Sequence, residues 1–262
     1  MNLLLPSGLR MHVDVYGDPA APPLLLVHGS TWTGDRDFGP GSGTIARFSQ
    51  RYRVIVPDCR GHGRSEATWT DGRLDYAFAG MAADMADLLR ALGAAPARVF
   101  GHSNGGNVAL YLACQHPEVT TAAVLLAANA YIDDHLRARV PVGMNPDRVA
   151  AESPEWMAEM IDLHDRHHGP GFWRHLLQAT IAETITNPDW TRADLADVHV
   201  PCLCVQGEND RVNAPGRHAQ VLAEWLPNGQ AWVPAGIGHS VHHEIPDAFE
   251  TRVEAFFRDA HH

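Results

Sequence analysis

The chain contains no lysine, and all 20 of its basic residues are arginines. This absence excludes sites that need a lysine amine, such as the P-loop nucleotide site, the Schiff base of pyridoxal enzymes and aldolases, and the serine–lysine dyad. Cysteine is also scarce, with four in 262 residues, so we expect buried core thiols and no disulfide scaffold. No apolar run is long enough to span a bilayer.

The 20 arginines are outnumbered by 31 acidic residues, which leaves a formal net charge of −11. An acidic surface repels phosphate backbones and anionic lipids, so we expect neither nucleic acid nor a membrane as a partner. The apolar start MNLLLPSGLR is too short for a secretory signal and has no basic residue ahead of it. We therefore expect a cytoplasmic protein, and nothing in the sequence indicates its oligomeric state.

Short apolar runs alternate with amphipathic stretches along most of the chain. The runs end at Gly, Pro or Asp, as strands of a parallel sheet do when both faces are buried. Strands are expected within 11–17, 22–29, 52–58, 97–103, 121–129, 200–210 and 230–236, and helices within 76–93, 104–117, 214–227 and 246–260. Strands that alternate with helices predict βαβ units and a mostly parallel, doubly wound α/β sheet.

Residues 131–196 interrupt this alternation, because they are rich in Trp, His, Arg and Met and show no strand pattern. We expect them to be helices inserted between two strands of the sheet. The predicted organisation is a core of residues 1–130 and 197–262 with a helical lid of residues 131–196. Such a lid would cover the carboxyl edge of the sheet, where ligands bind in these folds.

The segment GHSNGG, residues 101–106, matches the G-x-S-x-G pattern, and it lies between an expected strand and an expected helix. A serine at the tip of so tight a turn has a strained backbone, and its neighbours two positions away must be small. The turn would also place Ser103 at a helix N-terminus, which favours negative charge. This setting favours a nucleophile over a plain glycine-rich turn.

A nucleophilic serine needs a base, and the base needs an orienting acid. For this type of turn the expected chain order is serine, acid, histidine. Asp210 and Glu208 follow one predicted strand, and His239, His242 and His243 follow the last one. These are carboxyl ends of strands, where the catalytic edge of such a sheet lies.

Five segments, in this order and spacing, resemble the serine α/β-hydrolases of the esterase, lactonase and C–C-bond hydrolase branch. They are LLLVHGSTW, VIVPDCRGHGRSE, VFGHSNGG, CVQGENDRV and GIGHSVHHE, and the resemblance covers nearly the whole chain. It implies the α/β-hydrolase fold, with a sheet of about eight strands and a helical lid. It also implies that the second segment is a structural turn.

The resemblance implies a role for each candidate catalytic residue. Ser103 would be the nucleophile and Asp210, in preference to Glu208, the acid. His239 would be the base, because it directly follows GIG, in preference to the histidines at 242 and 243.

The same resemblance implies an oxyanion hole made of two backbone N–H groups. Asn104, the residue after the nucleophile, would supply one. The other would come from Ser30 in the first segment, with Thr31 as the second choice. His28 is expected to brace this loop by hydrogen bonds.

Aromatic residues near these segments suggest a small to medium, apolar substrate, with Trp32, Phe38 and Trp173 as candidate binding residues. The alternative is that such aromatics form the core of the lid. Three histidines at helical spacing, His164, His167 and His168, are interpreted as a solvated helix face and not as a zinc site. We expect no metal and no cofactor.

The predicted activity is hydrolysis of an ester, thioester or lactone through an acyl-enzyme. The same catalytic residues serve C–C-bond hydrolysis, acyl transfer, cyclisation and perhydrolase chemistry in related proteins, so these activities stay open. An alternative without catalysis is a small-molecule receptor with a vestigial triad. A serine in the turn disfavours the haloalkane dehalogenase and epoxide hydrolase branches, which use an aspartate there.

Overall fold

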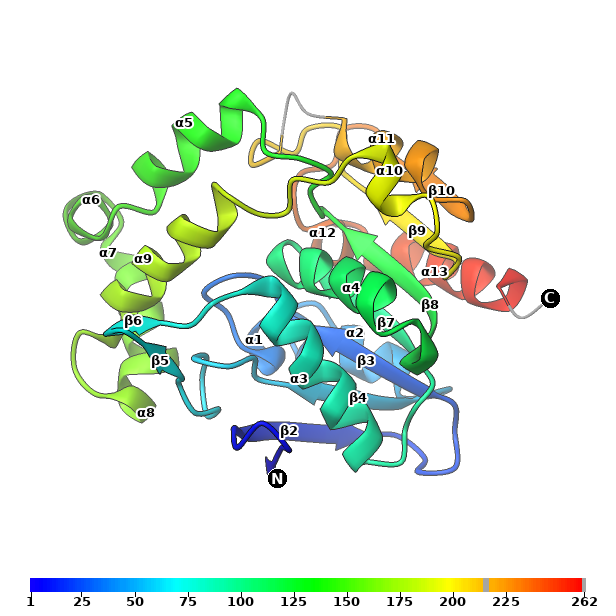
Figure 1. Cartoon of the computed structure of the whole chain (residues 1–262), viewed down its shortest axis with the longest axis horizontal. Helices are drawn as coiled ribbons and strands as arrows, with labels where there is room; N and C mark the ends of the chain where they lie inside the picture. Colours follow the sequence, from blue (N-terminus) through cyan, green and yellow to red (C-terminus); the bar gives the residue numbers. More distant parts are fainter. Residues whose placement is uncertain (214–216, 261–262) are drawn as a thin grey trace.

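A computed structural model describes residues 1–213 and 217–260 of the chain. Its centre is an eight-stranded sheet in the order β1-β2-β4-β3-β7-β8-β9-β10 (Figure 1). The strands are β1 (Asn2–Leu4), β2 (Arg10–Tyr16), β3 (Pro23–Val27), β4 (Arg53–Pro57), β7 (Ala97–His102), β8 (Thr120–Leu126), β9 (Cys202–Val205) and β10 (Gly229–Trp232). Pairing is antiparallel from β1 to β4 and parallel from β4 to β10, which confirms the predicted mostly parallel sheet.

Consecutive residues of the central strands pack into two different cores, one on each face of the sheet. In β3, Leu25 and Val27 belong to one core and Leu24 and Leu26 to the other. Because a strand alternates its side chains, a continuous apolar run is needed to fill both cores. Burying each such side chain stabilises the fold by about 2 kcal/mol.

Helices supply the opposite wall of each core. The first core takes apolar residues from α3 (Phe78–Ala91), α4 (Asn104–Gln115) and α11 (His218–Trp225), of which α3 and α4 lie side by side in Figure 1. The second takes them from α1 (Gly34–Phe38), α2 (Thr44–Phe48) and α13 (Pro246–Asp259). The first three residues of the helix expected over 214–227 lie outside the described residues.

The sequence between β8 and β9 forms helices and no strand, and all of its residues are described. The helices are α5 (Asp134–Gly143), α6 (Pro146–Glu152), α7 (Pro154–Met160), a π-helical turn (Ile161–Asp165), α8 (Arg166–His168), α9 (Phe172–Thr184) and α10 (Arg192–Leu195). Part of this segment has a small core of its own, formed by Val149, Met160, Trp173 and Leu177. The helices from α5 to α9 gather at the left of Figure 1 beside a two-stranded hairpin, β5 (Trp69–Thr70) and β6 (Arg73–Leu74).

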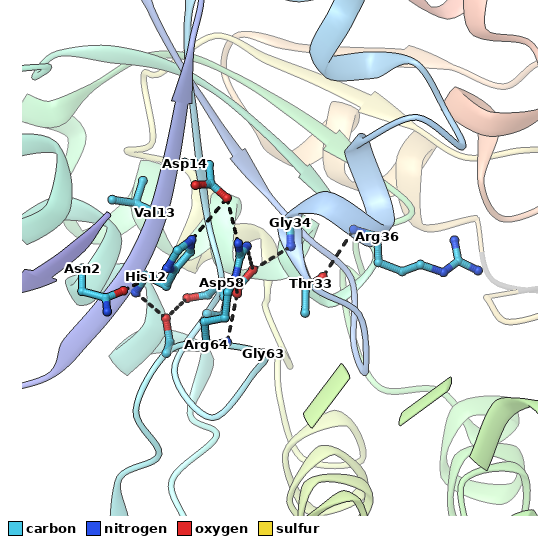
Figure 2. A network of polar contacts seen from close by, with 12 residues as sticks. Asn2, His12, Val13, Asp14, Thr33, Gly34, Arg36, Asp58, Gly63 and Arg64 are labelled. Carbon is cyan, nitrogen blue, oxygen red and sulfur yellow. Dashed lines mark hydrogen bonds and ion pairs between the residues drawn. The ribbon is translucent and has the colours of Figure 1, made fainter. Parts of the chain in front are cut away.

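A buried aspartate organises the turn after β4, as Figure 2 shows. The Asp58 carboxylate accepts hydrogen bonds from the backbone N–H of Gly34 at 3.1 Å and from Nε of Arg64 at 2.8 Å. Burial opposes ionisation, but the hydrogen bonds and charge of Arg64 hold the pKa of Asp58 below its ordinary value. Arg64 also pairs with Asp14 on β2. These bonds fix the start of α1 and therefore the loop between β3 and α1.

Three of the four cysteines are buried, as expected for core thiols, and Cys114 is partly buried. All four cysteines are unpaired, and Cys202 and Cys204 face the same core because they are two apart on β9. Among the described residues, no helix combines the length and the apolar character that crossing a bilayer requires.

Candidate active site

Ser103 lies at the turn between β7 and α4 with φ 55° and ψ −121°, a strained conformation for a residue with a side chain. The glycines on either side permit this turn by their lack of a Cβ. A Cβ on Gly101 would lie 2.0 Å from the carbonyl oxygen of Gly105, and one on Gly105 would lie 2.1 Å from that of Val27. The expectation that these two positions must be small is confirmed.

Three side chains from three loops meet above the ends of β7, β9 and β10. Nε2 of His239 lies 3.0 Å from Oγ of Ser103, and its Nδ1 lies 2.9 Å from both carboxylate oxygens of Asp210. Asp210 is fully buried, whereas the His239 side chain is 21% exposed. An imidazole that donates its Nδ1 proton to Asp210 has Nε2 free to accept the serine proton.

Asp210 is held as a carboxylate by several donors. Burial would raise its pKa, but the hydrogen bond and charge of His239 and the backbone N–H groups of Asn213 and Val212 together lower it. Asn213 in turn donates to the carbonyl of Ala127 at 2.7 Å. The loop after β9 is therefore fastened to the end of β8.

The alternative acid and bases have other partners. Glu208 accepts a hydrogen bond from the backbone N–H of Gly236. Nε2 of His242 bonds the Asp37 carboxylate, and Nε2 of His243 bonds the Asp37 backbone carbonyl, each at 2.8 Å. Neither histidine therefore has this nitrogen free for Ser103.

Asp37, which no sequence pattern singled out, is a fully buried carboxylate beside this group. It accepts hydrogen bonds from His102 at 2.9 Å, His242 at 2.8 Å and the backbone N–H of Gly29 at 2.8 Å. Burial would raise the pKa of Asp37, but His102 above all holds it well below the ordinary range. Burial also lowers the pKa of His242 to about 3. Asp37 therefore links the turn before Ser103, the loop of Gly29 and the helix after His239.

Asp37, His242 and His243 also form the one group, within the described part of the chain, close enough to share a metal ion. Their nearby atoms are already joined by hydrogen bonds. The interpretation of His164, His167 and His168 as a solvated helix face was wrong for His164, which is fully buried and bonds the carbonyl of Thr31. His167 is exposed, and His168 stacks on Phe172 with ring centroids 4.1 Å apart, so the three rings do not converge.

The loop after β3 brings Ser30 and Thr31 to the same site. His28 braces it as expected: its Nδ1 bonds the carbonyl of Gly29 at 2.8 Å and its Nε2 accepts from the backbone N–H of Cys59 at 2.9 Å. A Cβ built on Gly29 would lie 3.3 Å from Cβ of Ser103, so the loop packs directly against the serine turn. Among the described residues, the backbone N–H groups of Ser30 and Asn104 donate to no protein acceptor.

A cavity of about 430 Å³ opens beside Ser103 and His239. Its other lining residues are Gly29, Ser30, Thr31, Trp32, His102, Arg139, Val140, Gly143, Met144, Trp156, Arg211, Val212 and Ser240. A larger cavity of about 960 Å³ lies between the β5–β6 hairpin and α9, but it does not reach Ser103.

Of the three predicted substrate-binding aromatics, only Trp32 lines the cavity beside Ser103. Phe38 is fully buried against Phe100 in the core beneath the sheet, and Trp173 packs in the core of the helical segment. The prediction was wrong for these two because an apolar pattern indicates burial but not the surface against which a ring is buried. Trp156, Arg139 and Arg211 line the cavity instead; the position of Arg211 directly after Asp210 is the one signal that could have indicated it.

A serine turn after a parallel strand, a histidine after the last strand and an acid loop before it define the class of α/β hydrolases. The family described as alpha/beta hydrolase fold matches residues 22–180, and the chain belongs to it. This membership supports a hydrolase function.

The chain is similar to hydrolases of different kinds. It is 27% identical to a putative carbamate hydrolase of a Caulobacter strain, over 94% of this chain and 95% of that one. It is 28% identical to a 2-hydroxymuconate semialdehyde hydrolase of Pseudomonas putida, over 98% and 94%. A solved N-acyl homoserine lactone degrading enzyme superposes with a TM-score of 0.75 at 25% identity, over 98% and 100%.

Proposed function

We propose that the protein is a serine hydrolase that cleaves an ester, thioester or lactone through an acyl-enzyme. One observation carries the proposal: Ser103, His239 and buried Asp210 form a continuous hydrogen-bonded row with distances of 3.0 Å and 2.9 Å. This row opens on a cavity that can hold a small molecule.

In the proposed mechanism, Oγ of Ser103 attacks the substrate carbonyl while Nε2 of His239 takes the serine proton. Asp210 holds the imidazole in orientation and stabilises its positive charge. The proton then passes to the leaving group as the bond to it breaks. Water, giving its proton to His239, attacks the acyl-enzyme. The bond from the acyl carbon to Oγ of Ser103 then breaks as His239 returns the proton to Oγ, which releases the acid and free Ser103.

We assign the oxyanion hole to the backbone N–H groups of Ser30 and Asn104, with Thr31 as the alternative to Ser30. The N–H groups of Ser30 and Asn104 lack a protein acceptor among the described residues, and donors of an oxyanion hole must be free in this way. The fixed position of Gly29 against Ser103 supports this assignment.

We also propose that residues 131–196 act as a lid on a core of residues 1–130 and 197–262. Five residues of this segment line the cavity beside Ser103. They are Arg139, Val140 and Gly143 on α5, Met144 in the turn between α5 and α6, and Trp156 on α7. A cavity of about 430 Å³ with this largely apolar wall suits a small to medium substrate.

C–C-bond hydrolysis is a second candidate function. It is favoured by the 28% identity to a 2-hydroxymuconate semialdehyde hydrolase across almost the whole chain. The same serine, histidine and acid could serve that reaction, because the fold alone does not determine the bond that is cleaved.

A fluorophosphonate probe, followed by a panel of p-nitrophenyl esters, lactones and vinylogous diketones, tests the proposal. We expect the probe to label the wild type and Ser7→Ala, whose serine is exposed on the turn after β1, but not Ser103→Ala. Turnover of esters or lactones supports the first candidate, and turnover of diketones alone supports the second. Absence of labelling and of turnover would favour a receptor and refute the enzyme.

A further inference from the structure

Two arginines in the wall of the cavity beside Ser103 have no acidic partner. Arg139 lies on α5, and Arg211 directly follows Asp210. Within the described part of the chain, neither guanidinium is within ion-pair distance of a carboxylate, and no Asp or Glu lines the cavity. By contrast Arg36, which stacks on the outer ring of Trp32, is paired with Glu159.

A contact of α5 brings this helix against the loop that carries Arg211. Nε2 of His135 bonds the backbone carbonyl of Arg211 at 3.3 Å. His135 and Arg139 are four residues apart on α5, so they share a face of the helix, where Cβ atoms at this spacing lie about 6 Å apart. The face that carries Arg139 therefore faces the loop that carries Arg211.

The charge of the protein makes this pair unusual. With a net charge of −11, the surface as a whole repels anions, yet the residues that line the cavity include two exposed arginines and no Asp or Glu. A guanidinium stays charged at any working pH and binds carboxylates through two parallel hydrogen bonds. The same wall contains the apolar side chains of Val140, Met144 and Val212.

We propose that Arg139 and Arg211 bind a carboxylate carried by the substrate. The substrate class is then an ester, thioester or lactone with a short apolar spacer and a free acid group. This inference rests on the proposed hydrolase function, since Arg139 and Arg211 line the cavity of Ser103. It defines which end of the substrate the lid helix α5 would recognise.

Matched substrate pairs, in which a methyl group replaces the negative charge of the carboxylate, test this subsite. One pair is mono-p-nitrophenyl adipate and its methyl ester, with the acid on the acyl side. The other is 4-acetoxybenzoate and its methyl ester, with the acid on the leaving group. We expect kcat/KM to favour the anionic member of at least one pair by about tenfold, and the preference to shrink with added salt.

The variants Arg139→Gln and Arg211→Gln should each reduce that preference by about threefold, because two arginines in a partly open site share the tenfold preference. Arg137→Gln is the matched control, because Arg137 is exposed on the same helix like Arg139 but does not line the cavity. Arg139→Lys should retain part of the preference. Equal kcat/KM for both members of both pairs, or a preference unchanged in both Gln variants, would overturn the proposal.

A binding measurement separates this inference from the proposed function. In Ser103→Ala, we expect calorimetry to show binding of monomethyl adipate or benzoate that is stronger than binding of dimethyl adipate or benzamide. Arg139→Gln and Arg211→Gln in that background should weaken only the anions. If wild type turns over no ester but the anions still bind in this pattern, the hydrolase proposal fails and the subsite stands; if neither anion binds preferentially, the subsite is refuted.

Discussion

Acid should destabilise this protein through His164, a buried histidine that joins the π-helical turn to the loop after β3. Its Nε2 lies 2.8 Å from the carbonyl of Thr31, and its Nδ1 accepts the backbone N–H of Gly63 at 3.0 Å. A neutral ring with its proton on Nε2 satisfies both bonds, whereas a protonated ring would direct an N–H at the N–H of Gly63.

Burial lowers the pKa of His164 to about 4. This pKa already includes the opposing hydrogen bond to the Thr31 carbonyl and the smaller effects of His28 and His168, which lower it, and of Asp58, which raises it. Below the ordinary value of 6.5, the unfolded chain binds a proton that the folded chain does not. Stability is therefore lost as the pH falls from about 6.5 towards 4, by about 1.4 kcal/mol per unit, which amounts to about 2 kcal/mol at pH 5.

Urea unfolding of wild type and His164→Gln at several pH values measures this effect. A glutamine can accept the N–H of Gly63 and donate to Thr31, but it does not titrate. We expect the free energy of unfolding of the variant to gain about 2 kcal/mol relative to wild type between pH 7.5 and 5. His167→Gln, at an exposed neighbouring position, should follow the wild type. Parallel curves for wild type and His164→Gln would refute the reasoning.

Three further predictions concern catalysis and stability. Ser103→Ala and His239→Ala should each lower kcat by at least about 10³-fold with circular dichroism unchanged, and a benign His239 variant would eliminate it as the base. Gly105→Ala should cost about 3 kcal/mol or prevent folding, because its Cβ would lie 2.1 Å from a backbone oxygen, whereas Gly41→Ala, with open space around it, should unfold like the wild type. Asp37→Asn should lower the thermal midpoint and cost about 3 kcal/mol, because it removes a buried charge from its donors; an unchanged midpoint would contradict this.

The strands and the serine turn could be predicted because their causes are local. A run such as PLLLV is apolar at every position, so it fits only a strand with both faces buried. The conformation of Ser103 follows from glycines within two residues of it. The sequence also indicated Asp210 and His239 by their order along the chain; the structure brings them within hydrogen-bond distance of one another, and their catalytic roles stay predictions.

The short elements and the wall of the cavity could not be predicted in the same way. The β5–β6 hairpin has two residues in each strand, too few for any periodic pattern. Phe38 and Trp173 are as apolar as Trp32, yet they fill cores while Trp32 lines the cavity. Hydrophobicity favours burial without selecting a partner.

The sequence by itself determined the alternation of strands and helices, the family and the strained turn at Ser103, because each depends on residues close together in the chain. Only the tertiary structure decided the surroundings of that serine. The buried Asp37 contacts His102 and His242, which are 65 and 205 residues away from it, and His135 on α5 bonds the backbone of Arg211, which is 76 residues away. Contacts over such separations depend on how the helices and loops pack, and no local pattern encodes that packing.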